Sequence, residues 1–181
     1  MTRSQIDLLE DSLTKTGALI AAVEPDQLHL PTPCAEFTVA QLINHLVGWA
    51  DSFANRLNSV KSDVDPNACI AGPAPASEFN RSAALVVSAY RADLEGARRF
   101  PIGILLMEYV THGWDLATAI GQICPFTDEE AKAGLAVGKA MLKPESRGPG
   151  QSFGPELPAS SESNSVQQLV AFLGRNPYWA S

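Results

Sequence analysis

Residues 101–121, PIGILLMEYVTHGWDLATAIG, predict the long helix around which the rest of the chain is organised. Pro101 suits the first helical turn, where its missing N–H group leaves no intrahelical bond unmade, and Gly121 suits the left-handed residue just past the end. Apolar residues surround Glu108 and His112 in this stretch, so both polar side chains lie at the edge of a core-facing stripe or within it. Polar groups in such a position need a partner.

Glu108 and His112 form an E-x-x-x-H pair, whose spacing places both side chains on one helix face, about 6 Å apart at Cβ. One interpretation is an ordinary pair that hydrogen-bonds internally or to water, and the other is a pair of metal ligands. The best candidate for a third ligand is His45, within TVAQLINHLVGW at residues 38–49, because it also borders an apolar helical stripe. Two imidazoles and one carboxylate would leave coordination positions open, as in catalytic metal sites.

Helical periodicity recurs through most of the remaining chain. In chain order, the expected helices cover residues 4–23, 39–60, 77–95, 101–121, 127–142 and 166–173. Thr38 with Gln41 has the capping-box pattern, Ser77 is expected to cap the third helix, and Thr127 begins a helix with acids in its first turn. Residues 61–76, with three prolines and no clear period, predict a long crossover. We therefore predict an all-α four-helix bundle with a long crossover between helices 2 and 3 and short C-terminal additions.

The chain length of 181 residues fits one domain, so we expect a single helical-bundle domain over residues 1–181. Within it, residues 143–165 are rich in Pro, Gly and Ser and predict an irregular surface segment. The patterns leave open whether the bundle forms a homodimer through one of its helix faces.

Charge and hydropathy argue against a nucleic-acid-binding, secreted or membrane-spanning protein. The net charge of −7 argues against a nucleic-acid partner, because such binding needs a basic surface. The N-terminus has no apolar run typical of a signal peptide, and no stretch is apolar enough to span a bilayer, so we expect a cytoplasmic protein.

The three cysteines include no C-x-x-C pair, which argues against a disulfide framework or a cysteine zinc site. Cys34 lies just before an expected helix start, where the helix dipole can lower a thiol pKa. We favour a buried structural thiol as the interpretation of Cys34.

Several separated motifs resemble the DinB/YfiT-like metal-binding bundle superfamily. They are PTPC-x-x-FTV at residues 31–39, NHL at 44–46, E-x-x-x-HGWDLA at 108–117, and the tail segments FGP at 153–155 and FLGR at 172–175. Within this superfamily, the chain is similar to the N-terminal domain of mycothiol-dependent maleylpyruvate isomerase and to stand-alone actinobacterial proteins of unassigned activity. The motifs occur in the expected order over most of the chain.

The resemblance implies a divalent metal at His45, Glu108 and His112, usually Zn²⁺, with Ni²⁺ or Fe²⁺ as alternatives. Asp115, three residues after His112, is expected either to accept a hydrogen bond from that imidazole or to be an ordinary solvated acid. Trp49 and Trp114 are candidates for the walls of the site. The resemblance also implies mycothiol or a related thiol as co-substrate.

Two classes of function remain open. In the first, the protein is a metal-dependent enzyme of S-transferase or isomerase type that uses a low-molecular-weight thiol such as mycothiol and an electrophilic substrate. Zinc coordination would deprotonate the thiol and make it a nucleophile near neutral pH. A metal-dependent hydrolase is a variant of this class. In the second, the protein is a non-catalytic metal-binding or stress-related accessory protein.

Overall fold

The regular elements of the computed structural model, which describes residues 3–93, 100–148 and 153–180, are helices. The α-helices are α1 (Gln5–Ala21), α2 (Val39–Leu57), α3 (Pro75–Ala92), α4 (Ile102–Ala119), α5 (Asp128–Met141) and α6 (Ser165–Phe172), and the short 3₁₀ helices are η1 (Pro25–Gln27), η2 (Pro66–Ala68) and η3 (Pro144–Ser146). Within the described ranges, β-type pairing is limited to two isolated bridges, Pro31 with Thr38 and Arg147 with Phe153. The predicted all-α class is confirmed.

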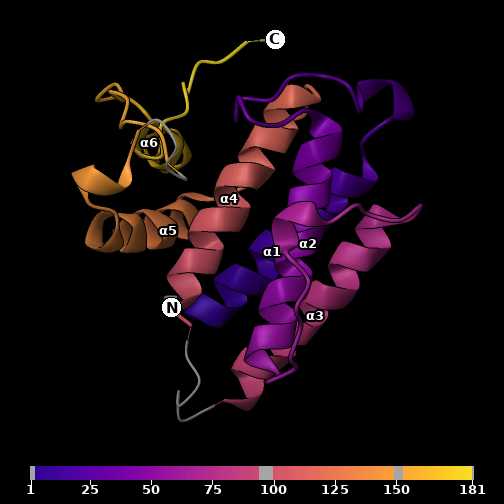
Figure 1. The fold of residues 1–181 in the computed structure, drawn as a ribbon. Helices are drawn as coiled ribbons and strands as arrows, with labels where there is room; N and C mark the ends of the chain where they lie inside the picture. Colours follow the sequence, from indigo (N-terminus) through magenta and orange to yellow (C-terminus); the bar gives the residue numbers. More distant parts are fainter. Residues whose placement is uncertain (1–2, 94–99, 149–152, 181) are drawn as a thin grey trace.

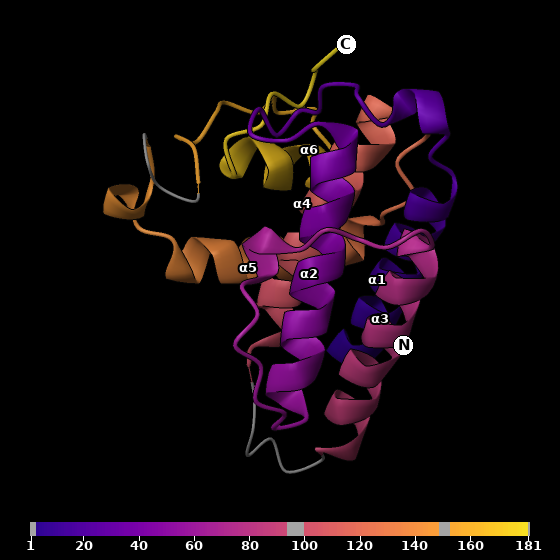
Figure 2. The same cartoon turned by 45° about the vertical axis from the view of Figure 1, so that its right-hand side comes forward.

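Helices α1 to α4 form the bundle (Figure 1). Helix α1 packs against α3 and α4, and α2 packs against α3 and α4. Helices α5 and α6 lie beyond α4, on the side away from α2 and α3, and the turned view keeps α2 beside α4 (Figure 2). No helix in the described ranges is both long and apolar enough to cross a membrane.

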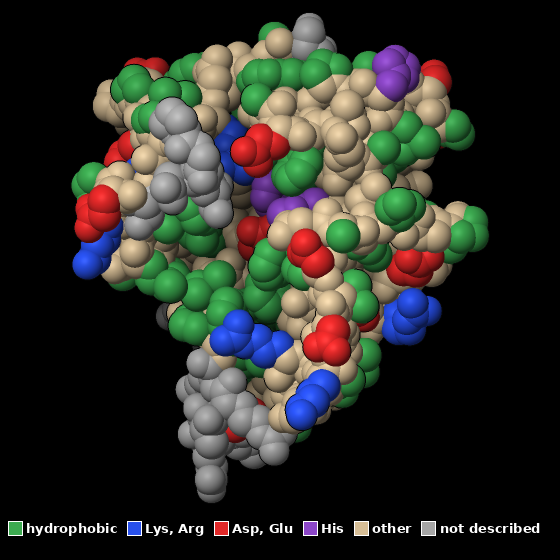
Figure 3. All heavy atoms as spheres, in the orientation of Figure 1, with side chains coloured by type: hydrophobic (Ala, Val, Ile, Leu, Met, Phe, Trp, Pro, Cys, Tyr) green, Lys and Arg blue, Asp and Glu red, His purple; other side chains and the backbone are tan. Residues whose placement is uncertain are grey.

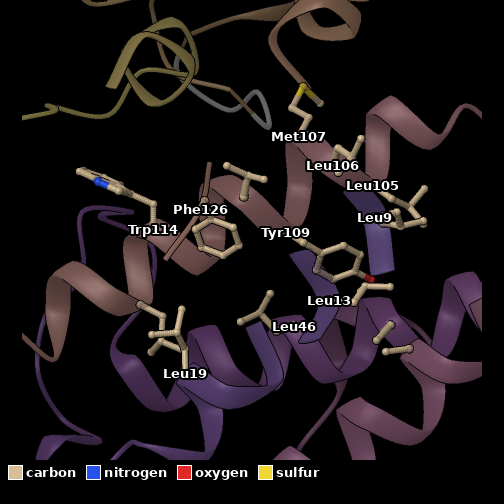
Figure 4. Close-up of a cluster of buried hydrophobic side chains, with 14 of the residues drawn as sticks. Leu9, Leu13, Leu19, Leu46, Leu105, Leu106, Met107, Tyr109, Trp114 and Phe126 are labelled. Carbon is tan, nitrogen blue, oxygen red and sulfur yellow. The ribbon is translucent and has the colours of Figure 1, made fainter. Parts of the chain in front are cut away.

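Helix α4 is the central element of the core, because α1 and α2 cover one side of it while α5 and α6 cover the other. Leu105 and Tyr109 of α4 are fully buried and lie close to Leu9 and Leu13 of α1 and Leu46 of α2 (Figure 4). The burial of α4 on both sides explains why its sequence is apolar nearly all round. A polar side chain on α4 must therefore find its partner inside the protein.

The predicted helix starts at Thr38 and Thr127 are confirmed, since each side chain accepts from a backbone N–H group in the first turn of its helix and completes a capping box. Gly121 has a φ of +68°, as expected just past the end of α4. Two expectations were wrong. Pro101 precedes α4 as its N-cap and is not in its first turn. Ser77 lies inside α3 and does not cap it, because α3 already begins at Pro75, and a proline has no N–H group that needs an acceptor in the first turn.

The helix ends also differ from the expected ones by two or three residues. Helix α1 ends at Ala21 and α2 ends at Leu57, where Ser59 takes a positive φ of 57° and turns the chain away. Helix α3 ends at Ala92, and the expected continuation over residues 94–95 lies outside the described residues.

The predicted crossover between α2 and α3 runs along α2 and is bonded to it. The Ala71 N–H group donates to Asn44 Oδ1 at 2.9 Å, and Trp49 Nε1 donates to Asn67 Oδ1 at 3.2 Å. A Cβ atom at position 48 would lie 2.3 Å from the carbonyl oxygen of Pro66, so glycine permits the close approach of the two backbones. These contacts place Asn67 at the edge of the site described below.

The segment expected to be irregular, residues 143–165, contains η3 and ends on Ser165, the first residue of α6, but the rest of its described part lacks regular structure. Arg147 ties this segment to α6, because its guanidinium donates to the carbonyl oxygens of Phe172 at 2.7 Å and Gly154 at 3.2 Å and stacks over the Phe172 ring at 4.3 Å. This anchoring brings Phe153 into the protein, where it is partly buried.

Candidate metal centre

The three predicted ligands come from two neighbouring helices. His45 lies on α2, and Glu108 and His112 lie one turn apart on α4. His45 Nε2 is 2.8 Å from Glu108 Oε1, and His112 Nε2 is 3.5 Å from the same oxygen. One donor atom from each residue lies within 4.8 Å of the other two. The structure thus brings together the residues that the sequence pattern singled out, while metal binding by them stays a prediction.

The Glu108 carboxylate is the negative centre of this group. Burial alone would raise its pKa, but the charge of the neighbouring His112 and the hydrogen bond with His45 outweigh burial and lower the pKa of Glu108 to about 2. The His45, Glu108 and His112 side chains are 14, 22 and 9% exposed, respectively. The carboxylate is therefore ionised near neutral pH, and each of the three side chains keeps a small exposed fraction.

Asp115 orients the His112 ring. His112 Nδ1 lies 3.0 Å from Asp115 Oδ2, and Asp115 is fully buried. An ionised carboxylate accepts hydrogen bonds, so this contact favours a proton on Nδ1 and turns Nε2 toward Glu108 and His45. Of the two expectations for Asp115, hydrogen bonding to the imidazole is what the structure shows, and a solvated acid is wrong.

The His45 ring is held differently, by packing. Its Nδ1 atom is buried and has no hydrogen-bond partner in the described part of the chain. The ring centroid lies 4.9 Å from that of Phe37 and 6.2 Å from that of Trp49. These two aromatic rings limit how the imidazole can turn without fixing its tautomer.

Arg175, which follows α6, is the buried cation of the site. Its Nη2 atom lies 3.4 Å from Asp115 Oδ2 and 3.5 Å from Cys34 Sγ, and Nη1 donates to the carbonyl oxygen of Leu173 at 2.9 Å. Cys34, His112 and Asp115 also form a second group with metal-ligand chemistry. The guanidinium already supplies a positive charge to this second group, so a metal ion there would have to compete with it.

The Cys34 side chain, for which we favoured a buried structural thiol, is partly buried. Burial nevertheless raises its pKa, and the Arg175 charge opposes that effect without cancelling it. The alternative of a pKa lowered by the helix dipole is therefore not supported, because the net shift is upward. The thiol is therefore protonated near neutral pH.

A cavity of about 470 Å³ opens beside the three predicted ligands. Figure 3 shows histidine side chains at the floor of a hollow on this face, with acidic and basic groups around it. The cavity is lined by α2, α4, the loops before these two helices, the crossover and the C-terminal part of the chain. The lining residues are Cys34, Glu36, Phe37, His45, Trp49, Phe53, Arg56, Asn67, Phe100, Ile104, Met107, Glu108, His112, Phe153 and Arg175. Trp49 forms part of the wall as expected, whereas Trp114 is buried elsewhere on α4 and does not line it.

Several side chains at the site were not singled out by the sequence interpretation, among them Arg175, Phe153, Asn67 and Arg56. Arg175 and Phe153 occur in tail motifs that were noted only for their family resemblance, and nothing in their local pattern points to α4. Asn67 lies in a crossover without periodicity, and its position depends on the hydrogen bond from Trp49.

The fold and the site together define a helical bundle in which two histidines and one carboxylate from facing helices converge beside a cavity. Residues 9–117 match the family described as the mycothiol maleylpyruvate isomerase N-terminal domain, and the chain belongs to this family. The match includes the three predicted ligands and Asp115, and it ends before Arg175. Membership relates the protein to mycothiol and to metal-binding bundles of the DinB type.

Two similar proteins come from Mycobacterium tuberculosis, one from strain H37Rv and one from strain CDC 1551. Each is 35% identical to this chain over 168 residues, which cover 88% of this chain and 91% of the relative. Both carry the name of an uncharacterised protein. No solved structure shows significant similarity to the chain.

Proposed function

We propose that the protein is a divalent-metal-dependent enzyme that uses a low-molecular-weight thiol such as mycothiol, in an S-transferase or isomerase type of reaction. The observation that carries this proposal is the convergence of His45 Nε2 and His112 Nε2 on Glu108 Oε1, at 2.8 and 3.5 Å, beside a cavity of about 470 Å³. Membership of the mycothiol maleylpyruvate isomerase N-terminal domain family supports mycothiol or a related thiol as the co-substrate.

The donor set fits a metal such as Zn²⁺. Zinc binds imidazole nitrogen and carboxylate oxygen at about 2.0–2.2 Å, and the donor atoms of His45, Glu108 and His112 lie within 4.8 Å of one another. Ni²⁺ and Fe²⁺ accept the same donor types. A divalent metal bound by these residues would lower the pKa of a coordinated thiol and so supply a thiolate near neutral pH.

The residues around the three predicted ligands orient their side chains for metal binding. Asp115 keeps the proton of His112 on Nδ1, and Arg175 holds Asp115 in place through the 3.4 Å contact. Phe37 and Trp49 pack against His45 and keep water from that side of the ring. The donor atoms of the three residues are therefore already close together, and a metal ion would replace the proton that His45 Nε2 shares with Glu108.

The cavity provides the room that a two-substrate reaction needs. Its volume of about 470 Å³ lies within the usual range for small-molecule sites, which is roughly 300–1,000 Å³. The three ligands form only part of its lining, so a thiol bound to them would leave space for an electrophilic substrate.

Metal content is the first test. Elemental analysis of the purified protein is expected to find up to one equivalent of zinc or another divalent first-row metal, and His45→Ala and His112→Ala are expected to lose it. His29→Ala is the matched control, because His29 is the one histidine of the sequence that is not a predicted ligand and it is exposed in a loop. Undiminished metal in both ligand variants contradicts the three-residue site.

Thiol binding is the second test. The metal-loaded protein is titrated calorimetrically with mycothiol, bacillithiol and glutathione, and whichever thiol binds is then offered electrophiles in conjugation assays. We expect binding that is lost in His112→Ala. If no thiol binds while the metal is present and the fold is intact, the thiol-dependent reaction is rejected. A hydrolase that uses metal-activated water, or a non-catalytic metal-binding protein, is then favoured.

A further inference from the structure

The cavity beside the three predicted ligands is continued by a wall of apolar and aromatic side chains. On α2, Trp49 and Phe53 follow His45 at steps of four residues, and their ring centroids are 5.4 Å apart. Phe100, just before α4, continues the wall with its ring centroid 5.3 Å from that of Phe53. Ile104 lines the same cavity one helical turn before Glu108. This wall runs from the ligands toward the last turn of α2 and the start of α4, which we call the far end of the cavity.

Arg56 stands at that far end. Its guanidinium carbon lies 4.8 Å from the centroid of the Phe100 ring, and the residue also lines the cavity. Among the described residues, no carboxylate forms an ion pair with Arg56. The stacking on Phe100 holds a cation beside the apolar wall and leaves its hydrogen-bond donors free.

The charges of the cavity are arranged along its length. The end near the ligands carries the Glu108 carboxylate and the exposed Glu36, while the cation there, Arg175, is already paired with Asp115. The aromatic end carries Arg56. In the metal-free protein, an anionic group therefore meets repulsion near Glu36 and Glu108 and attraction at Arg56.

We propose that the aromatic end of the cavity binds an apolar carboxylic acid, with its carboxylate on Arg56 and its body along Trp49 and Phe53. This inference rests on the proposed function, because it names the chemical class of the electrophilic co-substrate. His45 and Arg56 are about 16 Å apart along the helix axis, and arginine side chains lean back toward the helix start, so the acid spans on the order of 10–15 Å. Its reactive end then lies at the three predicted ligands.

The test compares acids with their uncharged amides. Calorimetry measures binding of 4-phenylbutanoate and 8-phenyloctanoate and of the two corresponding primary amides, with both the metal-free and the metal-loaded protein. In the wild type we expect each acid to bind about fivefold to tenfold more tightly than its amide, because a guanidinium bonds a carboxylate more strongly than a neutral carbonyl. Arg56→Gln is expected to reduce this ratio to about one.

Two further variants separate charge from shape. Lys139→Gln removes an exposed positive charge from α5, away from the cavity, and is expected to keep the wild-type ratio. Phe53→Leu removes an aromatic ring from the wall and is expected to weaken the binding of the acid and of the amide by the same factor. Arg56 is itself exposed, so Arg56→Gln is expected to fold, which circular dichroism checks.

The outcomes are distinct. Equal binding of acid and amide to the wild type overturns the inference. A preference for acids that survives in Arg56→Gln, or that occurs only with metal, also overturns it and places the carboxylate at His45, Glu108 and His112. Because the metal-free measurements involve neither metal nor thiol, they remain decisive even if the proposed thiol chemistry fails.

Discussion

Asp115→Asn tests how the predicted metal ligands are held, because it changes one buried charge and almost no shape. Asp115 is fully buried and lies between His112 Nδ1 at 3.0 Å and Arg175 Nη2 at 3.4 Å. The asparagine oxygen can still accept from the imidazole but carries no net charge. A charge-assisted hydrogen bond thus becomes a neutral one of about half the strength.

Two effects of different size are expected. Loss of the partner that orients a ligand imidazole typically lowers metal affinity by about 10- to 100-fold, or about 1.4–2.7 kcal/mol. The Arg175 guanidinium, which is about 9% exposed, also loses its counter-charge. Removing one partner of a buried ion pair costs about 3–5 kcal/mol, and the retained amide oxygen favours the lower end, about 3 kcal/mol.

Zinc affinity is measured by competition with a chromogenic chelator, and the free energy of unfolding by urea titration of the metal-free protein. Asp63→Asn, at an exposed crossover position, is the control for loss of one negative charge. A folded Asp115→Asn protein that binds zinc as tightly as the wild type would refute the role assigned to Asp115. Unchanged stability would refute the argument about Arg175.

Two further predictions concern stability. Burial raises the pKa of Tyr90 to about 12, although the Arg56 charge opposes this effect, so the folded state favours the neutral phenol. This preference contributes roughly 2–3 kcal/mol to the free energy of unfolding. The contribution is fully present below pH 10 and is lost as the pH rises from about 10 to 12. Urea unfolding at pH 8, 10 and 11 is expected to show a smaller alkaline loss in Tyr90→Phe, and an equally steep loss contradicts this. Glu130 is fully buried and bonds Lys15 Nζ at 2.7 Å, so Glu130→Gln is expected to destabilise the protein by about 3 kcal/mol. The neighbouring exposed Glu129→Gln serves as control, and equal urea midpoints for the two variants would contradict the importance of this ion pair.

The sequence alone determined the helices and the pair of polar residues on α4. The caps at Thr38 and Thr127 and the end at Gly121 depend on backbone groups a few residues away, so local patterns predict them. The spacing of Glu108 and His112 likewise follows from the helical repeat. For His45, periodicity indicated a polar residue beside a core stripe and so a candidate third ligand, and the family resemblance supported grouping it with the other two.

Only the tertiary structure decided what surrounds these residues. Arg175 reaches Asp115 across 60 residues of sequence and Cys34 across 141, and both contacts depend on how α6 packs over α5 and α4. Arg56 looks like an ordinary last-turn cation of α2 until Phe100 is placed beneath it. Periodicity describes which face of a helix is apolar, but it contains no information about which distant segment covers that face. The neighbours of each site residue are therefore set by the packing of complementary surfaces, which exists only once the chain has folded.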